Sequence, residues 1–235
     1  MEHSLSDVPL VVLAGGKATR LGSLGRDCPK YLQPVTETKC FADFHLDWIR
    51  EQGFSKIYFS LGYLAEAIRE YLSKYEKEFE LHFVEDGPVP LGTGGAIKKI
   101  SSLIKEDCLA LTYGDTILNL SCENMLKDFI ASGQPASMSV LENNIEGHEA
   151  NVLLARNSAI YNKNPAPLGA KHIDYGFLFL RTAYARGLSE KTSFDLAGAL
   201  SELSRDSKLQ AFEVQHRFWE IGSPEALDAF RKKFS

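Results

Sequence analysis

Apolar runs alternate with amphipathic segments along the first 141 residues of the chain. The runs have the length of buried strands, and the segments between them carry apolar residues at helical spacing. In one such segment Phe41, Phe44 and Trp48 share a face, and Gly53 is a suitable stop signal. The alternation predicts strands at 9–14, 56–61, 80–84, 108–113 and 136–141, and helices at 41–52, 63–76, 94–105 and 122–132.

The pattern changes from about residue 147 onward. The runs become shorter, and proline and glycine interrupt the chain at 164–169. Pro224 suits the first turn of a final helix, because that position needs no backbone N–H. We expect short strands at 151–155, 158–161 and 173–180, a helix at 194–204, a strand at 209–214 and a helix at 224–233.

The repeated strand–helix–strand order predicts an α/β fold. Right-handed crossovers then give a Rossmann-like, mainly parallel mixed sheet with helices on both faces. We see no internal repeat and no low-complexity linker, so we expect a single domain over 1–235, with one half at about 1–146 and another at about 147–235. Ligands of such sheets bind beyond the carboxyl ends of the strands.

Composition excludes several classes of partner. The net charge of −5 favours neither nucleic acid nor an anionic membrane. No apolar run approaches the roughly 18 residues of a membrane span, and the N-terminus lacks the pattern of a signal peptide. Four cysteines lie far apart without a Cys-x-x-Cys pair, so we expect reduced thiols, no zinc and a cytoplasmic protein.

A basic loop follows the first predicted strand. The apolar run at 10–13 ends in Gly15-Gly16, and Lys17, Arg20 and Lys30 come after it. Glycine allows phosphate oxygens to approach backbone N–H groups, arginine offers a planar donor fork and lysine a compact charge. In an acidic chain this local excess of positive charge predicts a polyphosphate site.

These residues resemble the first motif of the sugar-1-phosphate nucleotidyltransferases, which reads Leu-Ala-Gly-Gly-x-Gly-Thr-Arg-Leu and, after a spacer, Pro-Lys-Pro. Residues 13–21 and 29–31 match it, with Ala18 in place of a glycine and Tyr31 in place of a proline. The family's later motifs follow in order as Pro-Leu-Gly-Thr-Gly-Gly-Ala at 90–96, Tyr-Gly-Asp at 113–115 and Phe-Trp-Glu-Ile-Gly-Ser-Pro-Glu at 218–225. The resemblance covers nearly the whole chain, which looks most like the heptose-1-phosphate guanylyltransferases.

Two departures from the motif carry structural expectations. Ala18 requires either that this position avoid positive φ or that strain be tolerated. Tyr31 removes the fixed φ that proline would impose after Lys30, so we expect a less rigid loop.

The resemblance implies a GT-A-like nucleotidyltransferase fold and a reaction at the α-phosphorus of a nucleoside triphosphate. The products are a nucleotide sugar for surface polysaccharide synthesis and pyrophosphate. Arg20, Lys30 and Asp115 are the expected catalytic residues. Asp115 and Glu220 are the expected ligands of Mg²⁺, although the family usually has aspartate at the second position.

The resemblance also predicts two binding surfaces, the nucleotide half at 1–146 and the sugar half at 147–235. A carboxylate at Glu85 or Asp86 can accept two N–H groups from guanine, which favours GTP. The stretch Gly94-Gly95 is expected to open a helix. The expected nucleotide-binding residues are Leu13, Ala14, Gly15, Gly16, Thr19, Glu85, Gly92, Thr93 and Gly94. The expected sugar-phosphate-binding residues are Asn151, Lys163, Asp174, Tyr175 and Gly176.

Other functions stay open. A uridylyltransferase acting on N-acetylmuramate 1-phosphate or another hexose 1-phosphate has the same motifs. Ala18, Tyr31 and Glu220 also permit a catalytically silent homologue that binds nucleotide sugar and regulates a partner. An NAD-dependent dehydrogenase is excluded, because Gly15-Gly16-Lys17-Ala18 does not fit Gly-x-Gly-x-x-Gly. The sequence leaves the oligomeric state open, a homodimer included.

Overall fold

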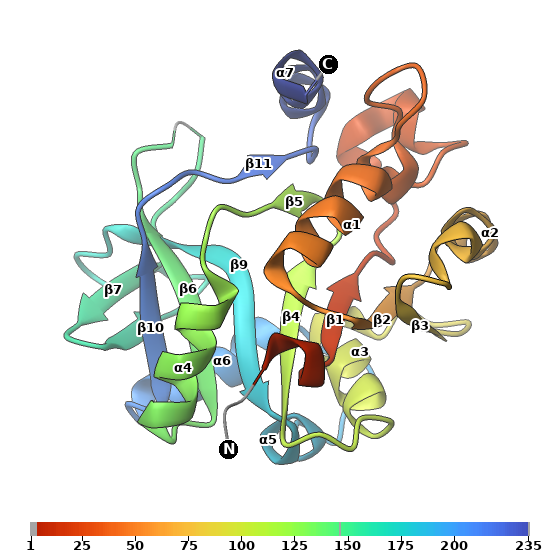
Figure 1. Cartoon of the computed structure of the whole chain (residues 1–235). Coiled ribbons are helices and arrows are strands. Elements are labelled where there is room, and N and C mark those ends of the chain that lie inside the picture. Colours follow the sequence, from red (N-terminus) through yellow and green to blue (C-terminus); the bar gives the residue numbers. More distant parts are fainter. Residues whose placement is uncertain (1–3, 146, 235) are drawn as a thin grey trace.

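One twisted sheet runs through the whole molecule (Figure 1). The computed structural model describes residues 4–145 and 147–234. Nine strands form the sheet: β1 Leu10–Leu13, β2 Lys56–Leu61, β3 Glu80–Glu85, β4 Cys108–Tyr113, β6 Ala136–Glu142, β7 Val152–Ala155, β8 Ser158–Tyr161, β9 His172–Arg181 and β10 Leu209–Val214. Their order is β3-β2-β1-β4-β9-β6-β10-β8-β7, and a separate two-stranded sheet pairs β5 Thr116–Ile117 with β11 Trp219–Glu220.

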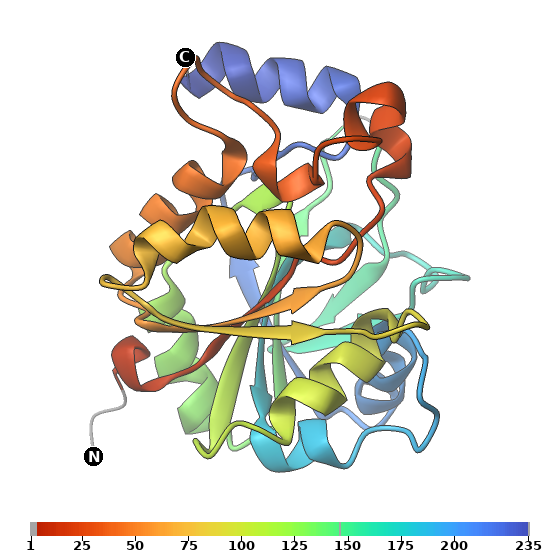
Figure 2. The same ribbon diagram turned by 90° about the vertical axis from the view of Figure 1, so that its right-hand side faces the viewer.

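Helices cover both faces of this sheet (Figures 1 and 2). The α-helices are α1 Phe41–Gln52, α2 Ala65–Leu72, α3 Gly92–Ser101, α4 Cys122–Ser132, α5 Thr182–Arg186, α6 Leu196–Arg205 and α7 Pro224–Phe234. Short 3₁₀ turns are η1 Leu5–Asp7, η2 Thr19–Gly25, η3 Lys30–Leu32 and η4 Ser73–Tyr75. Apolar residues of α1, α2, α4 and α7 form one core cluster, and those of α3, α5 and α6 form a second. The two clusters correspond to the two faces of the sheet, as expected for a doubly covered α/β sheet.

The mixed character of the sheet is confirmed. Parallel pairs join β1 to β2 and β4, β2 to β3, and β6 to β10. Antiparallel pairs join β9 to β4 and β6, and also connect β7, β8, β9 and β10. Strands β1 to β4 therefore form a classical parallel unit, whose carboxyl ends all lie at one edge.

Strand β9 joins the two halves of the chain. It lies between β4 and β6, and its Phe179 pairs with Ala110 on one side and Ser137 on the other. Residues 177–180 of β9 have no exposed surface. The two halves thus share one sheet and both core clusters.

Most predicted elements are present, with three differences. The helix expected at 94–105 begins at Gly92 and ends at Ser101. The helix expected at 63–76 divides into α2 and η4. The sequence did not predict the short elements β5, β11 and α5, or the 3₁₀ turns η1, η2 and η3.

A buried carboxylate fastens the start of α1. Asp43 Oδ2 accepts from the Cys40 N–H at 2.7 Å and from the Tyr71 hydroxyl at 2.6 Å, while Oδ1 accepts from Lys74 Nζ at 3.1 Å and from the Tyr75 hydroxyl. Burial raises the pKa of Asp43, but these donors together lower it to about 2.

This network predicts an acid-sensitive contribution to stability. A carboxyl with a depressed pKa stabilises the fold above its unfolded pKa of about 4 and loses that effect as the pH falls toward 2. The shift corresponds to about 2 kcal/mol. In urea unfolding, we expect Asp43→Asn to abolish this part of the pH dependence between pH 4 and 2. An unchanged slope in the variant would contradict the assignment.

Candidate active site

The carboxyl ends of β1 and β4 bring two motifs together. The Gly114 N–H donates to the Leu13 carbonyl at 2.9 Å, and the Ala14 N–H donates to the Ser60 carbonyl at the end of β2 at 3.0 Å. Asp115, which follows Gly114, therefore lies beside the glycine-rich loop that begins at Ala14. This placement follows from the parallel pairing alone.

A cavity of about 430 Å³ opens at this edge of the sheet. Ten of the predicted site residues line it: Leu13, Ala14, Gly15, Gly16, Thr19, Arg20, Lys30, Gly92, Thr93 and Asp115. Lining residues that the sequence analysis did not name as site residues include Ser60, Pro90, Ala96, Tyr113 and Gly222. Ser60 and Tyr113 lie at the carboxyl ends of β2 and β4, so the strand pattern could have identified them.

An ion pair lies in the wall of this cavity. Lys30 Nζ donates to Asp115 Oδ2 at 2.5 Å, and the two side chains are 15% and 26% exposed. Such partial burial strengthens the attraction relative to a pair in water. The structure thus joins two predicted catalytic residues that are 85 positions apart in the sequence.

The buried side chain of Tyr31 anchors the backbone next to Lys30. Its ring is 1% exposed, lies 5.6 Å from the ring centre of Phe59, and its hydroxyl lies 3.1 Å from His45 Nδ1. Aromatic packing thus anchors the chain at the position where the family motif has a proline.

Ala18 adopts the left-handed conformation, with φ 52° and ψ 31°. The strain that the sequence left open is therefore present, because a Cβ in this region costs roughly 1–2 kcal/mol. A neighbouring contact is also close, since a Cβ built on Gly25 would lie 2.6 Å from the Ala18 carbonyl oxygen.

We expect Ala18→Gly to stabilise the protein by about 1 kcal/mol, since glycine adopts positive φ without that penalty. Urea unfolding would measure this. Ala131→Gly, in the exposed last turn of α4, is the matched control and should instead destabilise. Equal signs for the two variants would contradict the strain at Ala18.

Glu220 reaches the same edge on β11. Its residue pairs with Thr116 of β5, and the Ile221 N–H donates to the Asp115 carbonyl at 3.0 Å. A Cβ built on Gly222 would lie 2.7 Å from Glu220 Oε2 and 3.5 Å from Arg20 Nη2, so the bare glycine leaves room between these groups. The two predicted metal ligands thus come from directly paired segments.

This donor set fits Mg²⁺. Within residues 4–145 and 147–234, no group of three or more His, Cys, Asp or Glu side chains converges on a metal position. Mg²⁺ needs fewer protein ligands than that, because it keeps several waters and binds through one or two carboxylates plus substrate phosphates. Asp115 and Glu220 would hold it. His148, which the sequence analysis did not single out, has Nε2 3.6 Å from Glu220 Oε1.

Three predicted sugar-side residues gather next to the cavity. Asn151 Oδ1 accepts from the Asp174 N–H at 2.9 Å, and Asp174 Oδ1 accepts from the Gly176 N–H at 3.0 Å. A Cβ on Gly176 would lie 3.4 Å from the ring of Tyr113, which lines the cavity. Burial raises the pKa of Asp174 to about 6, although the Gly176 N–H and the charge of Lys163 oppose the rise.

Tyr175 does not join this group. It is 1% exposed, its hydroxyl accepts from the Asn119 N–H at 2.9 Å, and its ring meets Phe218 edge-on. Side chains alternate along a strand, so Tyr175 of β9 faces the core while Asp174 and Gly176 face the other way. The two-residue period could have shown this in the sequence.

Two predicted nucleotide-binding residues also lie outside the cavity lining. The Glu85 carboxylate pairs with Arg69 of α2. Gly94 is a packing position, because a Cβ there would lie 2.2 Å from the nearest atom of the Phe194 ring. Asp86 lines the cavity instead of Glu85, and its Oδ2 accepts from the Leu91 N–H at 3.2 Å.

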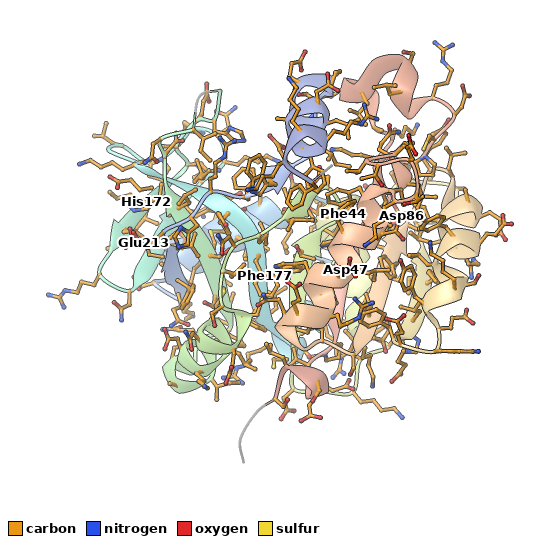
Figure 3. The ribbon with its side chains drawn as sticks, turned by 45° about the horizontal axis from the view of Figure 1, so that its top comes forward. Phe44, Asp47, Asp86, His172, Phe177 and Glu213 are labelled. Carbon is orange, nitrogen blue, oxygen red and sulfur yellow. The ribbon has the colours of Figure 1, made fainter. Side chains whose placement is uncertain are left out.

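Lys163 and His172 are engaged by carboxylates. Lys163 Nζ lies 2.9 Å from Asp195 Oδ2. His172 Nε2 lies 3.2 Å from Glu213 Oε1, and this pair points to the opposite side of the molecule from Asp86 in Figure 3.

A glycine-rich basic loop and a paired carboxylate at the carboxyl edge of parallel strands define a nucleotide-binding α/β protein. Residues 10–170 match the MobA-like NTP transferase domain, and the chain belongs to this family. In the described part of the chain, no helix combines the length and the apolar character needed to cross a lipid bilayer.

Relatives of this chain include two proteins named D-glycero-alpha-D-manno-heptose 1-phosphate guanylyltransferase. The one from Campylobacter jejuni is 30% identical over 115 residues, which are 49% of this chain and about half (51%) of the relative. The one from Aneurinibacillus thermoaerophilus is 25% identical over 224 residues, covering 94% of this chain and 95% of the relative. Among solved structures, HddC from Yersinia pseudotuberculosis complexed with GMP-PN superposes with a TM-score of 0.75 at 26% identity, over 97% of this chain and all of that one.

Proposed function

We propose that this chain transfers a nucleotidyl group from a nucleoside triphosphate, with GTP favoured, to a sugar 1-phosphate, with heptose 1-phosphate favoured. The products are a nucleotide sugar and pyrophosphate. The Lys30–Asp115 pair in the wall of the glycine-rich cavity carries the proposal. The names of both guanylyltransferase relatives and the guanine nucleotide in the HddC complex support the choice of base and sugar.

The proposed reaction is a single displacement. An oxygen of the sugar phosphate forms a bond to the α-phosphorus, and the bond from that phosphorus to the oxygen bridging to the β-phosphate breaks. This chemistry needs positioning and charge neutralisation more than covalent help. Arg20 holds the triphosphate, and Lys30 neutralises negative charge at the reacting centre. Mg²⁺ held by Asp115 and Glu220 would add positive charge at the phosphates.

The two halves of the chain supply different binding residues. The loop 13–20, Gly92 and Thr93 contact the nucleotide in the half at 1–146, and Asp86 replaces Glu85 as the carboxylate that reads the base. In the half at 147–235, Asn151, Lys163, Asp174 and Gly176 contact the sugar phosphate. A cytoplasmic location, where nucleoside triphosphates are available, and a homodimer are part of the same proposal.

Pyrophosphate release tests the function. The assay pairs GTP, UTP, dTTP, CTP and ATP with the 1-phosphates of heptose, mannose, glucose and N-acetylmuramate, in the presence of Mg²⁺ and with EDTA as control. Turnover of GTP with heptose 1-phosphate is the expected result. Turnover only of UTP with N-acetylmuramate 1-phosphate would shift the assignment to a uridylyltransferase. Silence on every pair, with nucleotide still binding, would favour the regulatory homologue.

A further inference from the structure

A segment of the C-terminal half crosses the start of α3. The Phe194 N–H donates to the Leu91 carbonyl and the Gly94 N–H donates to the Phe194 carbonyl, both at 3.0 Å. The Ser193 hydroxyl donates to the Pro90 carbonyl at 2.8 Å. Residues 193–195 therefore hold residues 90–94 at the start of α3, which include the cavity-lining Gly92 and Thr93.

Asp195 ends this segment and contacts a residue of each half of the chain. Its Oδ1 accepts from the Thr93 hydroxyl at 3.0 Å and from the Ala197 N–H at 3.0 Å, as N-cap of α6. Its Oδ2 accepts from Lys163 Nζ at 2.9 Å. One carboxylate thus joins Thr93, at the start of α3, to the ammonium of Lys163 in the other half of the chain.

The Lys163 side chain needs a carboxylate partner to hold its ammonium in a defined position. Its side chain is 65% exposed, and a long free lysine loses rotamer entropy when its ammonium is held in one place. The Asp195 backbone is held by α6 and by the neighbouring residues 193–194. Its carboxylate can therefore hold the Lys163 ammonium in one position. The ammonium has three donors, and the bond to Asp195 leaves two of them for phosphate oxygens.

We propose that Asp195 is a positioning residue that acts through Lys163. It holds the Lys163 ammonium beside Thr93, so that a sugar 1-phosphate binds next to the bound nucleotide. The inference rests on the proposed function, and in particular on Lys163 as a contact of the sugar phosphate.

Asp195→Asn tests this with little disturbance of the fold. Asparagine keeps the oxygen that accepts from Thr93 and Ala197 and is an equally good N-cap, but it loses the charge that holds Lys163. We expect the KM for heptose 1-phosphate to rise about five- to tenfold, with kcat and the KM for GTP within twofold of the wild type. Asp206→Asn, at the other end of α6 and paired with Lys208 at 3.2 Å, is the control and should change none of these values.

A double mutant tests whether Asp195 acts on the KM through Lys163. Lys163→Met alone should raise the same KM, and adding Asp195→Asn should raise it no further. Additive effects would overturn the inference, because Asp195 would then act without Lys163. An unchanged KM in Asp195→Asn, or a fall in kcat together with a lowered Tm, would also overturn it. If the wild type turns over no sugar 1-phosphate, the proposed function fails and the inference with it, whereas the other outcomes leave that function intact.

Discussion

Replacing Asp115 with asparagine is expected to lower kcat by about 10³-fold, the loss typical of removing one preorganised electrostatic group from a reacting centre. The substitution removes the only charge that pairs with Lys30 among the described contacts of that lysine. It also removes one of the two carboxylates that we propose as ligands of Mg²⁺. The fold should persist, because Asp115 holds β11 through its backbone carbonyl and not through its side chain.

Pyrophosphate release and urea unfolding, measured on the same preparation, test this expectation. Asp107→Asn is the matched control, because Asp107 is exposed and immediately precedes β4 at the opposite edge of the sheet. It should retain the wild-type rate. A rate within tenfold of the wild type in Asp115→Asn would remove Asp115 from the catalytic assignment.

Lys30→Met should lower kcat by about 10²- to 10³-fold, because methionine preserves the length of the stem but not the charge that faces the phosphates. Tyr31 remains anchored in the core, so the loop should keep its place and the KM for GTP should change less than kcat. Because Lys30 and Asp115 are in direct contact, the double variant should lose much less than the product of the two single losses.

Lys56→Met provides the control for this series. Lys56 pairs with Glu106 at 2.7 Å, and both side chains are partly buried, but the pair lies at the amino edge of β2, away from the cavity. Its loss should affect stability without affecting kcat. Equal losses of activity in Lys30→Met and Lys56→Met would mean that Lys30 acts only through folding.

The sequence predicted the strands and helices that have strong local signals. Strands β2, β4, β8 and β10 and helices α1 and α4 have the expected bounds, because apolar periodicity and turn residues define both of their ends. The predicted start of α3 was two residues late, because Gly94-Gly95 was expected to open the helix and Gly92 to precede it. The helix begins at Gly92, and the Gly94 N–H donates to the Phe194 carbonyl, a contact 100 residues away in the sequence.

The predicted site residues also fall into two groups, those that the sequence could place and those that it could not. Leu13 at the end of β1 and Asp115 just after β4 line one cavity, as expected, because parallel pairing aligns those strand ends. The sequence could not place residues whose position in the site depends on the direction of the side chain. Glu85 and Asp86 are neighbours, yet only Asp86 lines the cavity, since Arg69 of α2 holds the Glu85 carboxylate elsewhere. No local pattern in the sequence reports that partner.

The position of β9 has a consequence for how this protein is made. When a ribosome has completed β4 and β6, the central position of the sheet between them is vacant, and it is filled only after residues 172–181 have emerged. Until then two strands, both rich in apolar residues, present open hydrogen-bonding edges, which is the condition that favours wrong pairing between nascent chains. Closure also depends on contacts across about 70 residues between β4 and β9, which slows it. The interval before β9 emerges is therefore the period in which the open edges of β4 and β6 favour pairing with another nascent chain.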